Sequence, residues 1–360
     1  MADQTLKYHH HGRFQVAGGV LPDAVTAYQT FGDPANPCVV APTYYGGKLA
    51  LGGGLMGPSI NGHRLTRVMF TPPKNIALDM LAGEGKTLDT KKYYVVTFAS
   101  FCNGESSSPS NTSVPYNGPY FPAISYEDNV RAQYAVVTNV LGIKKVYCVA
   151  GFSMAGQQAY YWATMYPDFV DKIAVVVSSA RTSEHSRCIM EGPIAALTAS
   201  KDFEGGNYTS TPQHGMRAFG RVLLAWVHGQ TWYREHKYLK DGQHPDLMSF
   251  IREEAEGTWL QHWDANDMLA LMKIWQTGDI SLVRHNGDYE KALKSIEAEV
   301  LLVPSSTDLF FPPEDSKIEL SLLKKAKLVL LETNWGHSGQ SPEDFIFACT
   351  QVEKFLAGAI

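Results

Sequence analysis

A serine has small residues two positions before it and two positions after it, at the point where an apolar run ends. Ser153 lies in "GFSMAG" (151–156), which differs from the G-x-S-x-G pattern of a nucleophile elbow by the methyl group of Ala155. The preceding "VYCVAG" (146–151) predicts a strand, and the following "GQQAYYWATMYP" (156–167) predicts a helix. A serine on so sharp a turn would expose its hydroxyl as a nucleophile, whereas an ordinary strand–helix turn is the alternative.

A serine hydroxyl is a poor nucleophile unless a base removes its proton, so a histidine and an acid must accompany it. Asp308 follows the apolar run in "EVLLVPSSTDLFF" (299–311), and His337 follows the next run in "KLVLLETNWGH" (327–337). Taken singly, Asp308 is better explained as a turn residue and His337 as a loop histidine. The order Ser, Asp, His, with each residue after a predicted strand, favours a catalytic triad of Ser153, Asp308 and His337.

The elements that must position these residues alternate between strands and helices. Six near-continuous apolar runs predict the strands of a mostly parallel sheet buried on both faces, and they cover 37–42, 93–98, 146–151, 172–179, 299–304 and 327–332. Ser125 stands three residues before Asp128, which predicts a capped helix that ends at Gly142. The fold class is therefore α/β.

One long stretch interrupts this alternation. Residues 181–290 contain no strand-like run and are helical and aromatic-rich in pattern, which predicts an all-helical cap inserted into the sheet. The core would then comprise 1–180 and 291–360. Two biased segments, the glycine-rich 44–57 and the serine-rich 103–113, follow predicted strands, where α/β proteins build their sites.

Composition excludes several classes of protein. Of the 360 residues, 44% are hydrophobic and 19% are charged, which suits a globular chain with a large core. The net charge of −5 without a basic stripe argues against binding of nucleic acid. The sequence contains no run of about 18 apolar residues, so no membrane span is predicted. The polar N-terminus, together with five cysteines that show no close pairs or C-x-x-C spacing, favours a cytoplasmic protein with reduced thiols. His9, His10 and His11 are expected in a solvated tail rather than in a metal site.

Beyond the serine turn, further motifs resemble one known group, the homoserine O-acetyltransferase-like family of α/β hydrolases. The resembling stretches are "PTYYGG" (42–47), "GEGKTLDTKKYYVV" (83–96), "NGPYFPAISYEDNVRAQ" (117–133), "SMAGQQAYYWATMYPDFV" (153–170), "SSAR" (178–181), "WDANDML" (263–269), "TDLFFPPEDS" (307–316) and "GHSG" (336–339). The resemblance implies an α/β-hydrolase fold and the same triad. It also implies an oxyanion hole made by two backbone N–H groups, one from Met154 and one from Tyr44 or Tyr45. Tyr45 would also line the substrate pocket.

Departures from the family pattern concern the substrate. Ile194 stands where the family places an arginine suited to a carboxylate, and Ser338 stands where it places an aspartate suited to an ammonium group. Arg181 or Arg187 could replace the missing arginine. The segment 48–78 is longer than the family's usual link, which should reshape the mouth of the pocket.

The sequence therefore predicts a serine-nucleophile enzyme that forms an acyl-enzyme from a small molecule. The favoured activity is hydrolysis of an ester, thioester or lactone of an apolar compound of secondary metabolism, without metal or cofactor. An O-acyltransferase using acetyl-CoA as co-substrate on an alcohol other than homoserine is the alternative. A ligand-binding or cyclisation pocket on the same fold is a further one. The resemblance also admits a homodimer formed through the cap.

Overall fold

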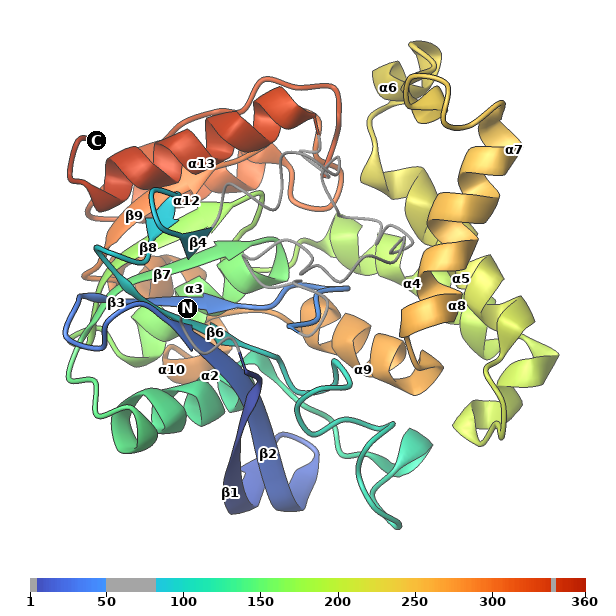
Figure 1. Ribbon diagram of the computed structural model, residues 1–360, viewed down its shortest axis with the longest axis horizontal. Helices are drawn as coiled ribbons and strands as arrows, with labels where there is room; N and C mark the ends of the chain where they lie inside the picture. Colours follow the sequence, from blue (N-terminus) through green and yellow to red (C-terminus); the bar gives the residue numbers. More distant parts are fainter. Residues whose placement is uncertain (1–4, 50–81, 338–340) are drawn as a thin grey trace.

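A single large sheet organises the chain. The computed structural model describes residues 5–49, 82–337 and 341–360. Within them, one sheet has eight strands in the order β1-β2-β6-β3-β7-β8-β9-β10 (Figure 1). The strands are β1 (Lys7–Val16), β2 (Gly19–Phe31), β3 (Cys38–Pro42), β6 (Tyr94–Phe98), β7 (Val146–Phe152), β8 (Val170–Val176), β9 (Glu299–Val303) and β10 (Ala326–Leu328). Two short strands, β4 (Ala82–Gly83) and β5 (Leu88–Asp89), pair separately.

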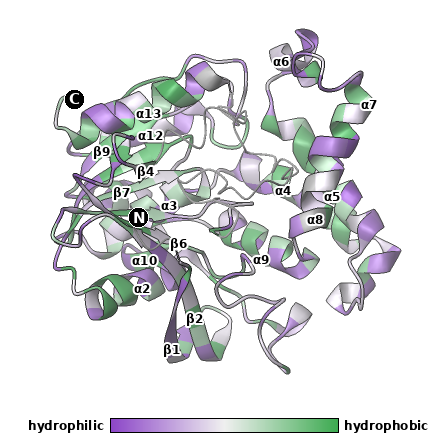
Figure 2. Ribbon diagram, in the orientation of Figure 1, coloured by the Kyte–Doolittle hydropathy of each residue, from purple (hydrophilic) through white to green (hydrophobic). Residues whose placement is uncertain are grey.

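The strands from β6 to β10 are parallel, which confirms the predicted mostly parallel sheet. Successive residues of these strands pack alternately into two separate buried clusters. Along β8, for example, Ile173 and Val175 belong to one cluster and Ala174 to the other. Most residues of the central strands are accordingly apolar, as expected of a sheet that is covered on both faces, although β8 also contains Asp171 and Lys172 (Figure 2).

Helices cover the two faces of the sheet. On one side α3 (Met154–Met165) packs against β7 and β8, with α2 (Tyr126–Ala135) beside it. On the other side α13 (Pro342–Leu356) packs against β8 and β9. The predicted capping box of α2 is present, since the side chains of Ser125 and Asp128 each accept the other's backbone N–H. A π-helical turn (Val136–Val140) continues α2 towards Gly142, which has a φ of +69°.

The N-terminal histidines contradict their prediction. His9, His10 and His11 do not lie in a solvated tail but in β1, which pairs antiparallel with β2, and β2 in turn pairs with β6. The ring of His10 bonds to Asp23 and that of His11 to Thr26. This hairpin was not predicted from the sequence because β1 is an edge strand and lacks an apolar run. Its side chains alternate between exposed and half-buried positions, so the run is polar.

A long helical stretch separates β8 from β9. It comprises α4 (Glu184–Thr198), α5 (Gln213–Val227), α6 (Gln230–Arg234), α7 (Leu247–Phe250), α8 (Thr258–His262), α9 (Ala265–Gln276), α10 (Ser281–Arg284) and α11 (Tyr289–Lys294). Helices α4 to α8 lie to one side of the sheet (Figure 1). After β9, helix α12 (Pro313–Leu322) leads to β10. The division into a core and a cap at 181 and 290 stays a prediction.

Candidate active site

Ser153 occupies the turn between β7 and α3 in a strained conformation. Its φ is +56° and its ψ is −127°, which is rare for a residue with a side chain. The turn is held by its own backbone. Ser153 N–H donates to the carbonyl of Val176 at 3.0 Å, and Ser153 O accepts from Gly156 N–H at 2.8 Å. The hydroxyl is thereby fixed just before the N-terminus of α3.

Two glycines allow this turn to close. A Cβ on Gly151 would lie 2.2 Å from the backbone carbon of Ala155, and one on Gly156 would lie 2.6 Å from Cβ of Ser178. Neither position can hold a larger residue without moving the backbone or the next strand's end. Ala155, by contrast, is accommodated with its side chain buried. The departure from the G-x-S-x-G pattern thus falls at a position where a methyl group fits.

The structure brings Ser153, His337 and Asp308 together in one hydrogen-bonded chain. The Oγ of Ser153 lies 2.8 Å from Nε2 of His337, and Nδ1 of His337 lies 2.7 Å from Oδ2 of Asp308. All three are buried, with exposed fractions of 3%, 1% and 3%. Since a carboxylate only accepts hydrogen bonds, it holds the proton on Nδ1 and leaves Nε2 to accept the serine proton.

The carboxylate is itself anchored by backbone donors. Oδ1 of Asp308 accepts from Phe310 N–H at 2.8 Å and from Phe311 N–H at 3.0 Å. These bonds leave Oδ2 directed at the imidazole of His337. The three side chains come from the segments that follow β7, β9 and β10, so the carboxyl ends of parallel strands assemble the chain, as in other α/β sheets.

Aromatic rings surround His337. The ring centres of Phe152, Phe310 and Phe311 lie 5.4, 5.2 and 5.5 Å from the imidazole centre. Tyr44 packs edge-on against Phe152, and burial raises the pKa of its phenol to about 12, so the phenol is neutral. The surroundings of the serine are therefore apolar, which strengthens the hydrogen bonds within the chain.

The two predicted oxyanion-hole residues lie next to the serine turn, since Met154 directly follows Ser153 and the ring of Tyr44 packs on Phe152. Met154 is the first residue of α3, so its N–H belongs to the helix N-terminus. Tyr44 opens the loop that follows β3 and closes a turn by accepting from Gly47 N–H at 2.9 Å. The two backbones thus come from the N-terminus of α3 and from the loop after β3, and an oxyanion hole formed by their N–H groups stays a prediction.

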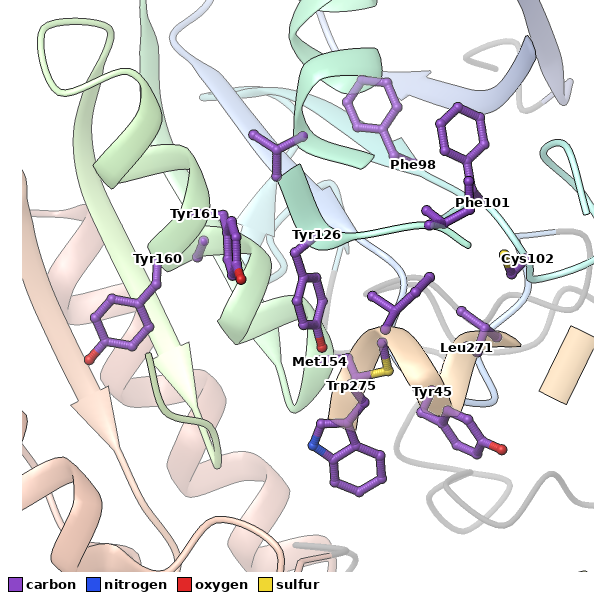
Figure 3. Packing of buried hydrophobic residues seen from close by; sticks show 14 of the residues in the cluster. Tyr45, Phe98, Phe101, Cys102, Tyr126, Met154, Tyr160, Tyr161, Leu271 and Trp275 are labelled. Carbon is purple, nitrogen blue, oxygen red and sulfur yellow. The ribbon is translucent and has the colours of Figure 1, made fainter. Parts of the chain in front are cut away.

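Tyr45, which is predicted to line the substrate pocket, packs against residues of the helical stretch. Its hydroxyl donates to the carbonyl of Met268 at 3.2 Å, and its ring packs on Trp259 and Trp275. Figure 3 shows the buried side chains of Tyr45 and Trp275 beside each other, with Met154 close by. Tyr45 therefore packs the loop after β3 against α9, and its polar group is already bonded.

Ile194 is not brought to the triad. It lies two turns along α4 from Ser186, the residue whose hydroxyl donates to the carbonyl of Phe310. Eight residues of helix rise by about 12 Å. Ile194 instead lines a separate cavity of about 470 Å³ together with residues of α9 such as Leu269 and Lys273. Ser338 lies outside the described residues, as does most of the long segment 48–78.

The two arginines that could replace the missing one have partners of their own. Arg181 stacks on the ring of Tyr289, with 4.1 Å to the ring centre, and faces Asp279. Arg187 pairs with Glu184 at 3.0 Å. Neither arginine contacts a triad residue through any of these bonds.

Sequence reasoning missed a buried acid near the site. Glu319 on α12 is fully buried and accepts from Ala180 N–H at 2.6 Å, Tyr160 OH at 2.6 Å and Tyr289 OH at 3.0 Å. Burial raises its pKa to about 7. In the sequence Glu319 resembles any helical glutamate, and nothing in its neighbours signals that it is buried.

The described part of the chain offers no group of three or more His, Cys, Asp or Glu side chains placed to hold a metal ion. Within the same residues, no helix is long and apolar enough to cross a membrane.

Comparison with known proteins identifies the fold family of the chain. The model of the alpha/beta hydrolase fold matches residues 77–344. An ethyl acetate hydrolase of Pseudomonas veronii is 33% identical over 71% of this chain and 73% of its own. A homoserine O-acetyltransferase of Chloroherpeton thalassium is 29% identical over 71% and 69%.

A solved acetyl esterase is 26% identical, with a TM-score of 0.86 over 98% of this chain and 97% of its own. Esterases and homoserine O-acetyltransferases thus both resemble this chain, as the sequence motifs predicted. Because the family model covers well over half of its length, the chain belongs to the α/β-hydrolase fold family.

Proposed function

We propose that this protein is a serine esterase that hydrolyses small apolar esters through an acyl-enzyme. The observation that carries the proposal is the buried chain from Ser153 Oγ through His337 to Asp308, at 2.8 and 2.7 Å. Such distances suit proton transfer from a hydroxyl to an imidazole without rearrangement. The relatives named as an ethyl acetate hydrolase and a homoserine O-acetyltransferase support acyl-transfer chemistry.

The reaction has two halves. In the first, Ser153 Oγ attacks the ester carbonyl carbon while His337 Nε2 takes the hydroxyl proton, and the carbonyl oxygen becomes an oxyanion that accepts from the N–H groups of Met154 and Tyr44. Collapse breaks the ester bond, and the departing alcohol leaves with the proton from Nε2. In the second half, water gives a proton to Nε2 while its oxygen attacks the acyl carbon. The bond between the acyl carbon and Oγ then breaks, Oγ takes the proton back from Nε2, and the acid is released. Asp308 stays ionised and orients the imidazole throughout.

The surroundings of the triad support an apolar substrate. Phenylalanine rings surround His337, while the nearby arginines Arg181 and Arg187 are engaged with other side chains. A zwitterionic amino acid would need charged partners at both ends. The relatives named as hydrolases of ethyl acetate and of acetyl esters support a short acyl group. Thioesters and lactones present the same carbonyl and belong to the same chemistry.

The test uses a panel of p-nitrophenyl esters with acyl chains of increasing length, together with labelling by a fluorophosphonate. We expect turnover that is fastest for acetate or butyrate and a single label on Ser153, found by mass spectrometry. Ser153→Ala should lose both, whereas Ser321→Ala, which changes an exposed serine of α12, should keep both. A protein that neither turns over esters nor takes the label would be a binding protein, and the proposal would fail.

A second candidate is supported by the homoserine O-acetyltransferases among the relatives. If an alcohol rather than water attacks the acyl-enzyme, the protein is an O-acyltransferase with acetyl-CoA as donor. Incubation with acetyl-CoA and a panel of apolar alcohols, followed by thiol release and product mass, separates the two. We expect slow thiol release that added alcohols do not accelerate, and acceleration would favour the transferase.

A further inference from the structure

A buried row of side-chain amides leads from the far side of α3 to the loop that contains Tyr44. Trp162 Nε1 donates to Gln133 Oε1 at 2.9 Å, Gln133 Nε2 donates to Gln158 Oε1 at 2.7 Å, and Gln158 Nε2 donates to the carbonyl of Thr43 at 3.0 Å. All four residues are at most 1% exposed. No step of the mechanism above uses this row.

The two ends of the row determine its direction. An indole nitrogen can only donate a hydrogen bond, and a backbone carbonyl can only accept one. The oxygen of Gln133 must therefore face Trp162, and the amide nitrogen of Gln158 must face Thr43. A reversed amide at either position would set two donors or two acceptors against each other in a buried site, so the row holds a single orientation.

The row ends on the peptide that carries a proposed oxyanion donor. The carbonyl of Thr43 and the N–H of Tyr44 belong to one planar trans peptide, and they point in opposite directions. A bond that fixes the carbonyl therefore fixes the direction of the N–H. Gln158 holds the carbonyl from the buried side, so the Tyr44 N–H is turned the other way.

The remaining polar atoms of Thr43 are held as well. Its N–H donates to Phe98 O at 2.8 Å, and its Oγ1 accepts from Ser100 N–H at 3.0 Å. Gln158 is itself on α3, five positions after Ser153, and its Nε2 also lies 3.5 Å from the carbonyl of Met154. The same amide thus adjoins both residues of the proposed oxyanion hole.

We propose that Gln158 is a positioning residue that aims the Tyr44 N–H at the oxyanion, with Gln133 and Trp162 fixing the orientation of its amide. This inference rests on the proposed function, because an oxyanion forms only if Ser153 attacks a carbonyl. Its consequence is specific. Loss of the amide should weaken binding of the transition state while leaving binding of the neutral substrate nearly unchanged.

The test compares Gln158→Met with Gln157→Met. Methionine keeps the length of the side chain and removes the amide donor. Gln157 is the matched control, since it is equally buried on the same helix and also makes two side-chain bonds, to Tyr126 OH at 2.7 Å and to Thr182 Oγ1 at 3.0 Å, but it does not reach Thr43. Both variants lose buried hydrogen bonds, and only one loses the bond to the oxyanion loop.

Three quantities are measured for each variant: kcat/KM for p-nitrophenyl acetate, Ki for an aliphatic trifluoromethyl ketone that forms an oxyanion adduct, and Ki for the corresponding plain ketone. Deleting an oxyanion donor costs about 10²–10³ in rate, so displacing one should cost about 10- to 100-fold. For Gln158→Met we expect kcat/KM to fall and the trifluoromethyl ketone Ki to rise by this factor. The plain ketone Ki should change less than about threefold, and Gln157→Met should stay within about threefold in all three.

Two results would overturn the inference. One is a kcat/KM for Gln158→Met equal to that of Gln157→Met, and the other is a plain ketone Ki that rises as much as that of the trifluoromethyl ketone. If Gln158→Met does not fold, Gln133→Met leaves Gln158 in place but removes its orienting donor, and we expect a fall of about three- to tenfold. A wild-type protein without turnover or label would instead overturn the proposed function.

Discussion

Replacing Glu319 by glutamine should make the protein more stable above neutral pH. The carboxyl group is buried on α12, and burial raises its pKa from 4.5 to about 7. Its oxygens accept from Ala180 N–H, Tyr160 OH and Tyr289 OH. Glutamine has nearly the same shape, is neutral like the protonated acid, and offers one acceptor oxygen and an NH₂ group with two donors. The variant therefore resembles the protonated native state at every pH.

The magnitude follows from the difference between the folded and unfolded states. In the unfolded chain the carboxyl ionises near 4.5, whereas in the folded protein it keeps its proton until about pH 7. Between these values the folded state binds more protons, so the free energy of unfolding falls as pH rises. At about 1.4 kcal/mol per pH unit, the wild type loses about 2–3 kcal/mol between pH 5 and pH 8 through this group, and Glu319→Gln does not.

Thermal unfolding at pH 5 and pH 8 measures the effect. Relative to wild type, the Tm of Glu319→Gln should rise by about 3–4 °C more at pH 8 than at pH 5, given the unfolding entropy of a chain of this size. Glu314→Gln, which changes an exposed glutamate of the same helix, is the control and should show no such pH-dependent difference. An equal Tm difference at both pH values would refute the reasoning, because it would mean that Glu319 titrates alike in the folded and unfolded states.

Further predictions concern the serine turn and the substrate. Ser153→Ala and His337→Ala should each lower kcat by several orders of magnitude, and the double variant should be scarcely worse, since the triad acts as a unit; strictly additive losses would contradict this. Ala155→Gly should keep ester turnover within a few-fold, whereas Ala155→Val should abolish it by crowding the tight turn. Gly151→Ala should lose both turnover and several degrees of Tm, because its Cβ would lie 2.2 Å from the backbone of α3, and an unchanged Tm would be inconsistent with that contact. With acetyl-CoA and L-homoserine, thiol release should show a kcat/KM below about 10⁴ M⁻¹s⁻¹, the lower end of the range of enzymes on their own substrates.

Much of the sheet was predictable because its central strands are buried on both faces. Runs such as 146–151 and 299–304 are apolar throughout, and they match β7 and β9 within two residues. The predicted strand 327–332 is shorter, since β10 ends at Leu328 and Leu331 forms only an isolated bridge to Ser305. The residues of the hydrogen-bonded chain were predictable from their types and from their places after strands.

The positions of the two side chains predicted to contact the substrate, Tyr45 and Ile194, could not be predicted in the same way. The directions of the Tyr45 and Ile194 side chains depend on how α9 and α4 pack, and one sequence does not carry that information. Gln158 and Glu319 were missed for a related reason. Each is a common helical residue whose burial and partners come from segments that are distant along the chain, so nothing local distinguishes it from a solvated side chain.

The edges of the sheet bear on how the protein behaves when concentrated. A second chain can pair with the free N–H and C=O groups of an exposed edge strand, and such pairing can start aggregation. At one edge, β1 shifts register twice within a few residues, between His10 and Gly12 and between Gly12 and Phe14, and Gly12 has a φ of +64°. A strand interrupted in this way offers no continuous row of donors and acceptors. At the other edge β10 is only three residues long. Removal of this irregularity should therefore promote self-association of the protein through β1.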